Sequence, residues 1–386
     1  MLLKIENTPR PYAWGSTTAI AELLGAEPSG APEAELWLGD HPGSPARIVG
    51  ADAGGASDLS ALLRARGEKL PFLLKVLAAA EPLSLQAHPT IAQAREGFAR
   101  ENAAGIALDA PERNYKDELH KPELIYALSD PFVALAGFRP VAESHAALVA
   151  LGEPALEPLI ARLDDDAALP GVVRWLIEGG PAIARIVDAL TAAARALERD
   201  PRDTEGWATV RRLAEHYPGD PGIALSTLMH TVVLRAGEAL YLPTGTIHSY
   251  QQGLAIEVMA ASDNVLRGGL TPKHVDVAEL MRVLDARPVA EPRIAPVEVQ
   301  PGVRRFSPDV VDFALTVIAA GAAADGVTIE THGPAIVLSL EGDVTLEGVL
   351  DLHHGQAAYS DEPTLRVVGS GAAVVATGRH PDSVDA

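Results

Sequence analysis

The 386-residue chain contains no cysteine. That absence excludes disulfides, thiolate catalysis and cysteine-ligated zinc, so any bound metal must use histidine, carboxylate or amide donors. Basic residues are also scarce, because 31 Lys and Arg stand against 52 Asp and Glu and leave a net charge of −21. This balance disfavours a broad nucleic-acid or anionic-membrane surface, since both need basic patches. It leaves room for one small cationic pocket.

Long apolar runs are absent as well. No stretch reaches the 18 or more apolar residues of a membrane-spanning helix. The N-terminus becomes charged after a short apolar start and lacks the apolar region of a secretory signal. We therefore expect a soluble, cytoplasmic, monomeric protein that acts on a small molecule and has no nucleic-acid or membrane partner.

What the sequence does contain is a series of short apolar segments separated by turn residues and interrupted by one helical region. Within residues 140–227, apolar residues such as Val187, Leu190 and Ala194 recur at three- and four-residue steps, which is typical of amphipathic helices. The segments before and after are predicted as strands that end at Pro and Gly. The predicted fold is therefore mainly β with an α-helical insertion. Its predicted domains are a catalytic domain of residues 1–138 and 228–290, a helical insertion of 139–227, and a second β domain of 291–386.

Gln86 and His88 lie two residues apart in a predicted strand. Because side chains alternate along a strand, both would project from one face together with Ser84. An amide and an imidazole on one sheet face are a plausible pair of metal ligands, although the pattern alone has little specificity.

A base, an ammonium and a carboxylate are concentrated in the tetrad His120-Lys121-Pro122-Glu123, just before an apolar run. Such a charged cluster at the start of a strand is usually solvated. It acquires a functional interpretation only if a metal or an anion lies nearby.

Residues 237–248, GEALYLPTGTIH, fit the pattern G-x5-P-x-G-x2-H. This pattern resembles the second motif of cupins, which are jelly-roll β-barrels. Pro243 and Gly245 would make a tight hairpin, and His248 would enter the barrel mouth from the next strand. Three neutral donors and one carboxylate would then suit Zn²⁺, with Mn²⁺, Fe²⁺ and Co²⁺ also admitted. These four residues are Gln86, His88, Glu123 and His248.

Arg267 and Lys273 lie in a predicted loop that contains a pair of glycines. Arg can hold a phosphate as a planar fork and Lys as a point charge. Outside a barrel, the same residues would be interpreted as surface ion pairs with the many acids of the chain.

These motifs resemble those of type I phosphomannose isomerases, zinc enzymes of the cupin superfamily. They follow the order of that family, and the C-terminal segment is similar only as a second barrel-like series of strands. The stretches that carry the resemblance are PYAWGS at 11–16, ELWLGDHPGSPA at 35–46, PFLLKVLAAAEPLSLQAHP at 71–89, NYKDELHKPELIYAL at 114–128, GEALYLPTGTIHSY at 237–250 and EVMAASDNVLRGGLTPKHVDV at 257–277.

The resemblance implies two cupin jelly-roll barrels plus a helical domain, with one Zn²⁺ per chain. The implied zinc ligands are Gln86, His88, Glu123 and His248. The implied catalytic residues are Arg267, Glu257 and Lys121, and the implied substrate-binding residues are Ser84, Tyr250, Lys273 and Trp14, with Trp14 packing at the pocket edge. The sequence departs from the family at Leu119, where Asn is frequent, and at Asp40, where Thr or Ala is commoner.

The implied reaction interconverts D-mannose 6-phosphate and D-fructose 6-phosphate through a cis-enediol. Lys121 or Lys273 would anchor the phosphate, and the candidate proton carriers are Glu257, His120 and a zinc-bound water. Two other classes stay open. One is a non-catalytic sugar-phosphate-binding cupin, and the other is an iron-dependent cupin oxygenase, for which Gln86 is a poor ligand.

Overall fold

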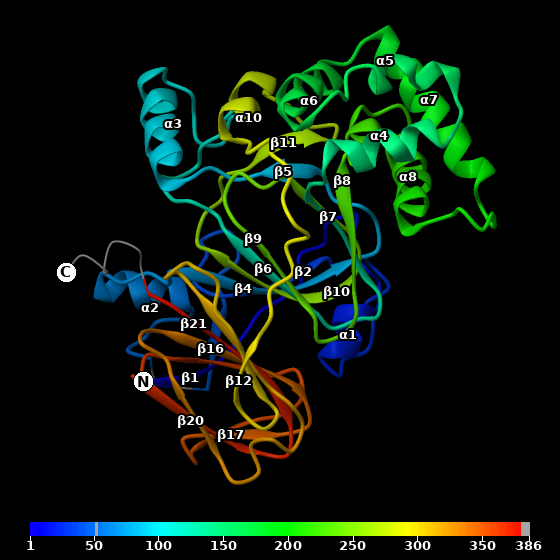
Figure 1. Ribbon diagram of the computed structural model, residues 1–386. Coiled ribbons are helices and arrows are strands. Elements are labelled where there is room, and N and C mark those ends of the chain that lie inside the picture. The colour runs from blue at the N-terminus through cyan, green and yellow to red at the C-terminus, as the bar shows by residue number, and fades with distance from the viewer. Residues whose placement is uncertain (51–52, 380–386) are drawn as a thin grey trace.

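The structure is a computed structural model that describes residues 1–50 and 53–379. Residues 380–386 of the predicted C-terminal domain lie outside that description. Figure 1 shows a central β body, a second β body at one end of it and a group of helices at the other end. The prediction of a mainly β fold with a helical insertion is therefore confirmed.

The central body is a nine-stranded sheet system organised around the long strand β10 (His248–Ala260). The first part of β10 pairs with β5 (Leu85–Ala87) and β7 (Phe132–Phe138), and the second part pairs with β4 (Phe72–Ala79) and β6 (Glu123–Ala127). One strand thus belongs to two sheets, and the sheets close around an interior. The other strands of this body are β2 (Glu35–Leu38), β8 (Met229–Leu234), β9 (Ala239–Leu242) and β11 (Leu266–Gly269).

The change of partners along β10 occurs at Gly253. A bulge between Tyr250 and Gln252 first shifts the register with β7, and Gly253 then has φ of +117°. A Cβ at this position would lie 2.8 and 3.0 Å from atoms of Phe132. Only glycine combines this backbone conformation with so close an approach, so it allows β10 to serve both sheets.

The register of β10 identifies the side chains that line the barrel interior. Glu257 pairs with Lys75 on one side and with Ile125 on the other, and Met259 pairs with Glu123. Paired residues project from the same face of a sheet, and all five are buried. Charged groups therefore lie inside the barrel beside apolar side chains.

The second β body consists of an eight-stranded and a four-stranded sheet. Its larger sheet includes β1 (Leu2–Glu6) and β3 (Arg47–Val49), so strands from the beginning of the chain pair with strands from its end. The predicted C-terminal domain of residues 291–386 leaves out these two N-terminal strands. The other strands are β12 (Val297–Gln300), β13 (Val303–Phe306), β14 (Ala314–Ile318), β15 (Val327–Glu330), β16 (Ala335–Glu341), β17 (Val344–Leu346), β18 (Leu350–Leu352), β19 (Ala357–Ser360), β20 (Thr364–Gly369) and β21 (Ala372–Thr377).

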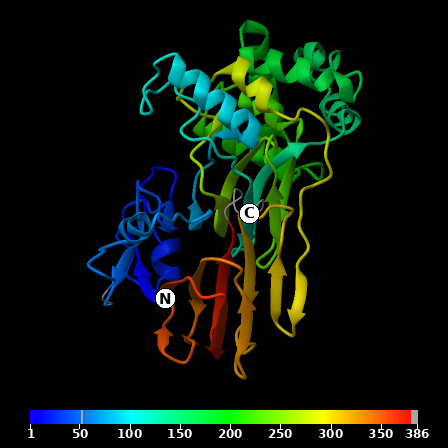
Figure 2. The same cartoon turned by 90° about the vertical axis from the view of Figure 1, so that its left-hand side faces the viewer.

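Helices cover the end of the central body that carries β5 and β11, as Figures 1 and 2 show. Apart from the helix of residues 91–103, these helices pack their apolar faces with Leu85, Ala87, Ile247 and Leu266 in one core. Helix packing thus holds β5 and β11 in place, the strands that carry Gln86 and Arg267. The helices at this end are α3 (Ile91–Ala103), α4 (Val141–Val149), η1 (Pro154–Leu156), α5 (Glu157–Ile160), η2 (Asp166–Ala168), α6 (Leu169–Glu178), α7 (Pro181–Ala196), α8 (Glu205–His216), α9 (Gly222–Ser226) and α10 (Val277–Val283).

Two further helices, α1 (Ala19–Leu23) and α2 (Leu59–Arg66), lie closer to the second β body. They pack with β4 and with strands of the C-terminal sheet in a shared apolar core. Across the described part of the chain, no helix has the length and apolar character that crossing a bilayer requires.

Packing between α3 and the segment leading to Glu123 depends on Gly97. A Cβ at Gly97 would lie 2.2 Å from the ring of Tyr115. Tyr115 is fully buried, and its hydroxyl donates to Glu279 of α10 at 2.6 Å, so the ring has no free space. We expect Gly97→Ala to destabilise the protein by about 1–3 kcal/mol through overpacking, despite the better helix propensity of alanine.

Gly171→Ala in α6 is the matched control, because a Cβ there would have no heavy atom within 4 Å. This change should be neutral or stabilise the protein by about 0.4–1 kcal/mol. Urea denaturation followed by circular dichroism compares the two variants with the parent. A Gly97→Ala protein as stable as the parent would contradict the proposed contact.

Candidate metal centre and active site

Three buried side chains from different strands converge inside the barrel. His88 follows β5, Glu123 opens β6 and His248 opens β10. Nε2 of His88 lies 3.1 Å from Oε1 of Glu123, and Nε2 of His248 lies 3.2 Å from Oε2. The three residues are at most 2% exposed, and their donor atoms lie within 4.8 Å of one another.

The hydrogen bonds of the two imidazoles determine which ring nitrogens carry protons. Nδ1 of His88 donates to the Asn264 carbonyl at 2.7 Å, and Nδ1 of His248 donates to the Thr246 carbonyl at 2.9 Å. A carbonyl can only accept, so each Nε2 of a neutral ring presents a lone pair to the carboxylate. Burial lowers the pKa of His88 to about 4, which keeps its ring neutral near pH 7.

Two lone pairs and a carboxylate repel one another unless a cation lies among them. Neither Nε2 atom has a hydrogen-bond partner, although both are fully buried. Imidazole rings fixed through Nδ1 by a carbonyl are the usual arrangement of metal-binding histidines. The donor set therefore fits a divalent cation bound by nitrogen and oxygen ligands.

The turn predicted from Pro243 and Gly245 connects the two histidine segments. It joins β9 to β10, and Gly245 adopts φ of +82°, a conformation that favours glycine. The Gly245 N–H donates to the His88 carbonyl at 2.8 Å. The motif thus fixes His248 at the start of β10 and also holds the backbone of His88.

Gln86 lies in the same row of residues across the sheet. It pairs with His248 of β10 on one side and with Arg267 of β11 on the other. Directly paired residues share a sheet face. Gln86, a sequence-predicted ligand, is therefore next to one histidine of the cluster and next to the predicted arginine.

Two neighbouring groups hold Glu123 as an anion. The Tyr250 hydroxyl donates to Oε2 at 2.8 Å, and Nζ of Lys121 lies 3.1 Å from Oε1. Burial acts to raise the pKa of Glu123, but the ammonium of Lys121 opposes burial and the pKa lies well below the usual range. Burial also raises the pKa of Tyr250, so its hydroxyl stays a donor.

A second charged group on the interior face centres on Lys75. Its Nζ lies 2.9 Å from Oε2 of Glu257 and 3.7 Å from Oε1 of Glu35, whose other oxygen accepts from the Trp37 indole at 2.6 Å. Burial acts to lower the pKa of Lys75, but Glu257 and Glu35 raise it above its usual value. Burial raises the pKa of Glu257, and Lys75 opposes that rise. The sequence predicts Trp37 only as a packing residue at the pocket edge. Lys75 and Glu35 were not identified from it, and the signal for Lys75 was one lysine within the apolar segment FLLKVLAA.

Arg267 is a half-buried cation without an acidic partner. Within the described residues its guanidinium makes no hydrogen bond or ion pair, and burial lowers its pKa. Lys273 is exposed, and both partial burial and the nearby Arg267 lower its pKa. Two adjacent cations without a carboxylate are suited to bind an anion.

The remaining sequence-predicted residues occupy less central positions. Trp14 is half-buried and packs against the apolar cluster of the barrel interior that includes Tyr250. Ser84 is half-buried just before β5. Nε2 of His120 lies 3.0 Å from Asp312 of the C-terminal body, so this candidate proton carrier is paired outside the metal cluster.

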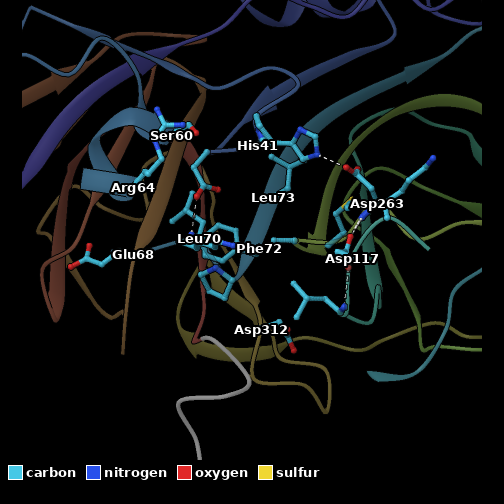
Figure 3. A pocket seen from close by; sticks show the side chains of 18 of the residues that line it. His41, Ser60, Arg64, Glu68, Leu70, Phe72, Leu73, Asp117, Asp263 and Asp312 are labelled. Carbon is cyan, nitrogen blue, oxygen red and sulfur yellow. Dashed lines mark hydrogen bonds and ion pairs between the residues drawn. The ribbon is translucent and has the colours of Figure 1, made fainter. Parts of the chain in front are cut away.

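A cavity of about 500 Å³ lies beside the His88–Glu123–His248 group, and none of these three residues lines it. Figure 3 shows its wall, with Phe72 and Leu73 on one side and Asp117 and Asp263 on the other. Leu73 and Met259 line the cavity, and Met259 pairs with Glu123, so the cavity and the metal cluster share a wall. Asp40, one of the departures from the family, lines this cavity and accepts a hydrogen bond from the Leu70 N–H at 3.2 Å.

Known proteins resemble this chain along nearly its whole length. Residues 2–141 match the family described as phosphomannose isomerase type I, catalytic domain. The chain is 40% identical to the mannose-6-phosphate isomerase of Escherichia coli (strain K12), covering 95% of this chain and 97% of the relative. It is 31% identical to the mannose-6-phosphate isomerase of Rattus norvegicus, covering 90% of each.

Solved structures agree with these sequence similarities. A crystal structure of a mutant phosphomannose isomerase from Salmonella typhimurium has a TM-score of 0.87 and 37% identity, covering 98% of this chain and 99% of that one. A crystal structure of mannose 6-phosphate isomerase, described as holo and zinc bound, has a TM-score of 0.86 and 36% identity at the same coverage.

A divalent cation should stabilise the folded protein through the His88–Glu123–His248 cluster. At a concentration one hundred times its Kd, Zn²⁺ should add about 2.7 kcal/mol of stability by mass action. His248→Ala should lose this gain, because one of the facing donors is removed. Thermal denaturation of the metal-free protein with and without Zn²⁺ measures the effect.

His353→Ala is the control for this experiment. His353 is exposed and its Nδ1 lies 3.1 Å from Asp343, away from the cluster. It should keep the full stabilisation by Zn²⁺. An equal gain in His248→Ala and the parent would show that the cation binds elsewhere.

Proposed function

The chain belongs to the type I phosphomannose isomerase family of enzymes, and on that premise we propose that it interconverts D-mannose 6-phosphate and D-fructose 6-phosphate at a zinc centre through a cis-enediol. The observation that carries the proposal is the set of buried imidazole lone pairs directed at Glu123. They lie in register with Arg267, which pairs with no acidic group of the described residues. We also propose a cytoplasmic monomer. The net charge of −21 supports a small-molecule substrate over nucleic acid or an anionic membrane.

Zinc would be held by Gln86, His88, Glu123 and His248. Neutral nitrogen and oxygen donors with one carboxylate are ligands that zinc accepts where cysteine is absent. When bound, the ion supplies positive charge that stabilises negative charge on the oxygens of the substrate. One ion per chain is proposed, since the described residues hold one such cluster of histidine and acidic groups.

The two cationic side chains near β11 would bind and polarise the substrate. Nζ of Lys121 is already 3.1 Å from Glu123, so Lys273 is the better candidate for the phosphate anchor. Binding at the phosphate, remote from the reacting carbons, would position C1 and C2 for proton transfer. Arg267 would stabilise the developing oxyanion with a fixed positive charge, and Ser84 and Trp14 would complete the pocket.

Glu257 is proposed as the group that moves the proton between C2 and C1. Glu257 is buried on the interior face of β10, two residues before Met259, which pairs with Glu123 across the sheet. Burial raises the pKa of this carboxyl, which strengthens it as a base, while Lys75 at 2.9 Å favours its ionised form. His120 is a weaker candidate because it pairs with Asp312.

Purified protein should produce fructose 6-phosphate from mannose 6-phosphate, measured as NADPH formation through glucose-6-phosphate isomerase and glucose-6-phosphate dehydrogenase. EDTA should abolish turnover and Zn²⁺ should restore it, provided that excess chelator is first removed. Folded, zinc-loaded protein that binds mannose 6-phosphate without turnover would instead support a non-catalytic sugar-phosphate-binding cupin.

The same assay tests Arg267. Arg267→Ala should lower kcat about 10²–10³-fold, the usual loss when one oxyanion-stabilising group is removed. Arg282→Ala on α10 is the control, because Arg282 is 55% exposed and pairs with Glu96 at the surface. Its kcat should equal that of the parent, and an Arg267→Ala enzyme with parental kcat would remove this residue from the mechanism.

Glu257→Gln keeps the side-chain shape and removes the base, so kcat should fall about 10²–10⁴-fold. In the parent, kcat/KM should decline as pH falls through the pKa of Glu257, which burial places above the usual glutamate value of about 4.3. The residual activity of Glu257→Gln should lack this acidic decline. Glu35→Gln, which removes the other acidic neighbour of Lys75, should retain it, and its persistence in Glu257→Gln would assign the proton to another group.

A further inference from the structure

The loop between β10 and β11 contains a fully buried amide, Asn264, that the proposed chemistry does not use. Its main-chain carbonyl accepts the Nδ1 proton of His88 at 2.7 Å and so determines the direction of the His88 ring. A main-chain oxygen is retained in every substitution. Only its position can be altered, and that position depends on what holds the loop.

The side chain of Asn264 ties this loop to the segment 116–119, which leads into Lys121 and Glu123. Nδ2 donates to the carbonyl of Leu119 at 2.8 Å, and to the carbonyl and Oδ1 of Asp117 at 3.0 and 3.1 Å. Oδ1 accepts from the main-chain N–H of Lys116 at 2.7 Å. Both ends of the amide therefore bind the same segment.

The carboxylate of Asp117 closes the connection from the opposite side. Its Oδ1 accepts from the Ser262 hydroxyl at 2.8 Å, and its Oδ2 accepts from the Asp263 N–H at 2.8 Å. The Ser262 hydroxyl in turn accepts from the N–H of Asn264 at 3.2 Å. The segment 116–119 and the loop 262–264 thus form one continuous hydrogen-bonded unit.

We propose that Asn264 is a positioning residue of the metal centre. It holds the carbonyl that orients His88 in a fixed relation to the segment that brings Glu123 into the barrel. These two ligands come from distant parts of the sequence, and a rigid link between their supports arranges them before the metal binds. The inference rests on the proposed zinc centre and adds a residue that touches neither zinc nor substrate.

Asn264→Asp tests this role with almost no change of shape. It replaces the Nδ2 donor by an oxygen facing the Leu119 carbonyl and the Asp117 oxygens, so attraction becomes repulsion. Competition with a chromophoric chelator should show Zn²⁺ affinity weakened roughly 10–100-fold, as is typical when groups supporting a metal ligand are altered. The measurement is binding, so it does not depend on turnover.

Asn114→Asp is the matched control. Asn114 precedes the same segment, and its Nδ2 donates at 3.1 Å to Asp276, the residue just before α10, and not to the loop whose Asn264 carbonyl orients His88. The same chemical change is therefore made beside another carboxylate. Zn²⁺ affinity should be unchanged in this variant, even if its melting temperature without metal falls.

Ser262→Ala provides a milder second variant in case Asn264→Asp does not fold. It removes the hydroxyl that accepts from the Asn264 N–H and donates to Asp117, so two hydrogen bonds of this unit are lost. Zn²⁺ binding should weaken at least roughly fivefold, the value of one such bond.

Parental Zn²⁺ affinity in folded Asn264→Asp, or in Ser262→Ala if the first variant cannot be purified, would overturn the positioning role. A fall in the metal-free melting temperature without loss of affinity would do the same, since it would indicate a purely structural residue. A parent protein that binds no Zn²⁺ would overturn the proposed metal centre itself, so the two failures are distinguishable.

Discussion

The structure depends on one unfavourable electrostatic arrangement: two imidazole lone pairs facing the Glu123 carboxylate at 3.1 and 3.2 Å. Such an arrangement cannot hold itself together, so each participant is fixed from behind. Backbone carbonyls hold the rings of His88 and His248, while Tyr250 and Lys121 hold the carboxylate. The barrel supplies these supports because β10 bends between two sheets and carries His248 and Tyr250 on one strand. The packing of the fold thus maintains an electrostatic repulsion that a bound cation would remove.

The charged side chains inside the barrel are also arranged so that neighbouring groups compensate for an unfavourable environment. Buried ions are costly unless they are paired, and Lys75 lies between Glu257 and Glu35, while Lys121 lies beside Glu123. Arg267 is the exception, because no carboxylate of the described residues pairs with it. The chain has 52 acidic and 31 basic residues, so most basic side chains could find an acidic partner. This unpaired guanidinium is the feature on which the proposed binding of an anionic substrate rests.

Local patterns in the sequence predicted local features of the structure. The helical spacing of Val187 and Leu190 is found in α7, and the Pro-Gly turn before His248 joins two strands as expected. Pairing between distant segments was not predictable, because strand period contains no information on which distant strand is the partner, and β1 pairs with β19. Lys75 was missed for a related reason. In a strand buried on both faces, one lysine appears as an interruption of an apolar run until Glu257 is known to lie beside it. Asn264 was missed because its contact with His88 is made by the main chain, which leaves no mark in the side-chain sequence.

His120 shows how the second β body bears on the site. The sequence places this histidine next to Lys121, which made it a candidate for proton transfer, yet its Nε2 lies 3.0 Å from the buried carboxylate of Asp312. The segment leading to Glu123 is therefore held on two sides. The loop of Asn264 binds it on one side, and Asp312 of the second β body binds it on the other. Since β1 and β3 also belong to the C-terminal sheet, both ends of the chain share the body that supplies Asp312. The position of Glu123, the proposed metal ligand of the first barrel, thus depends on contacts with the second, so the two bodies act as one support for the site.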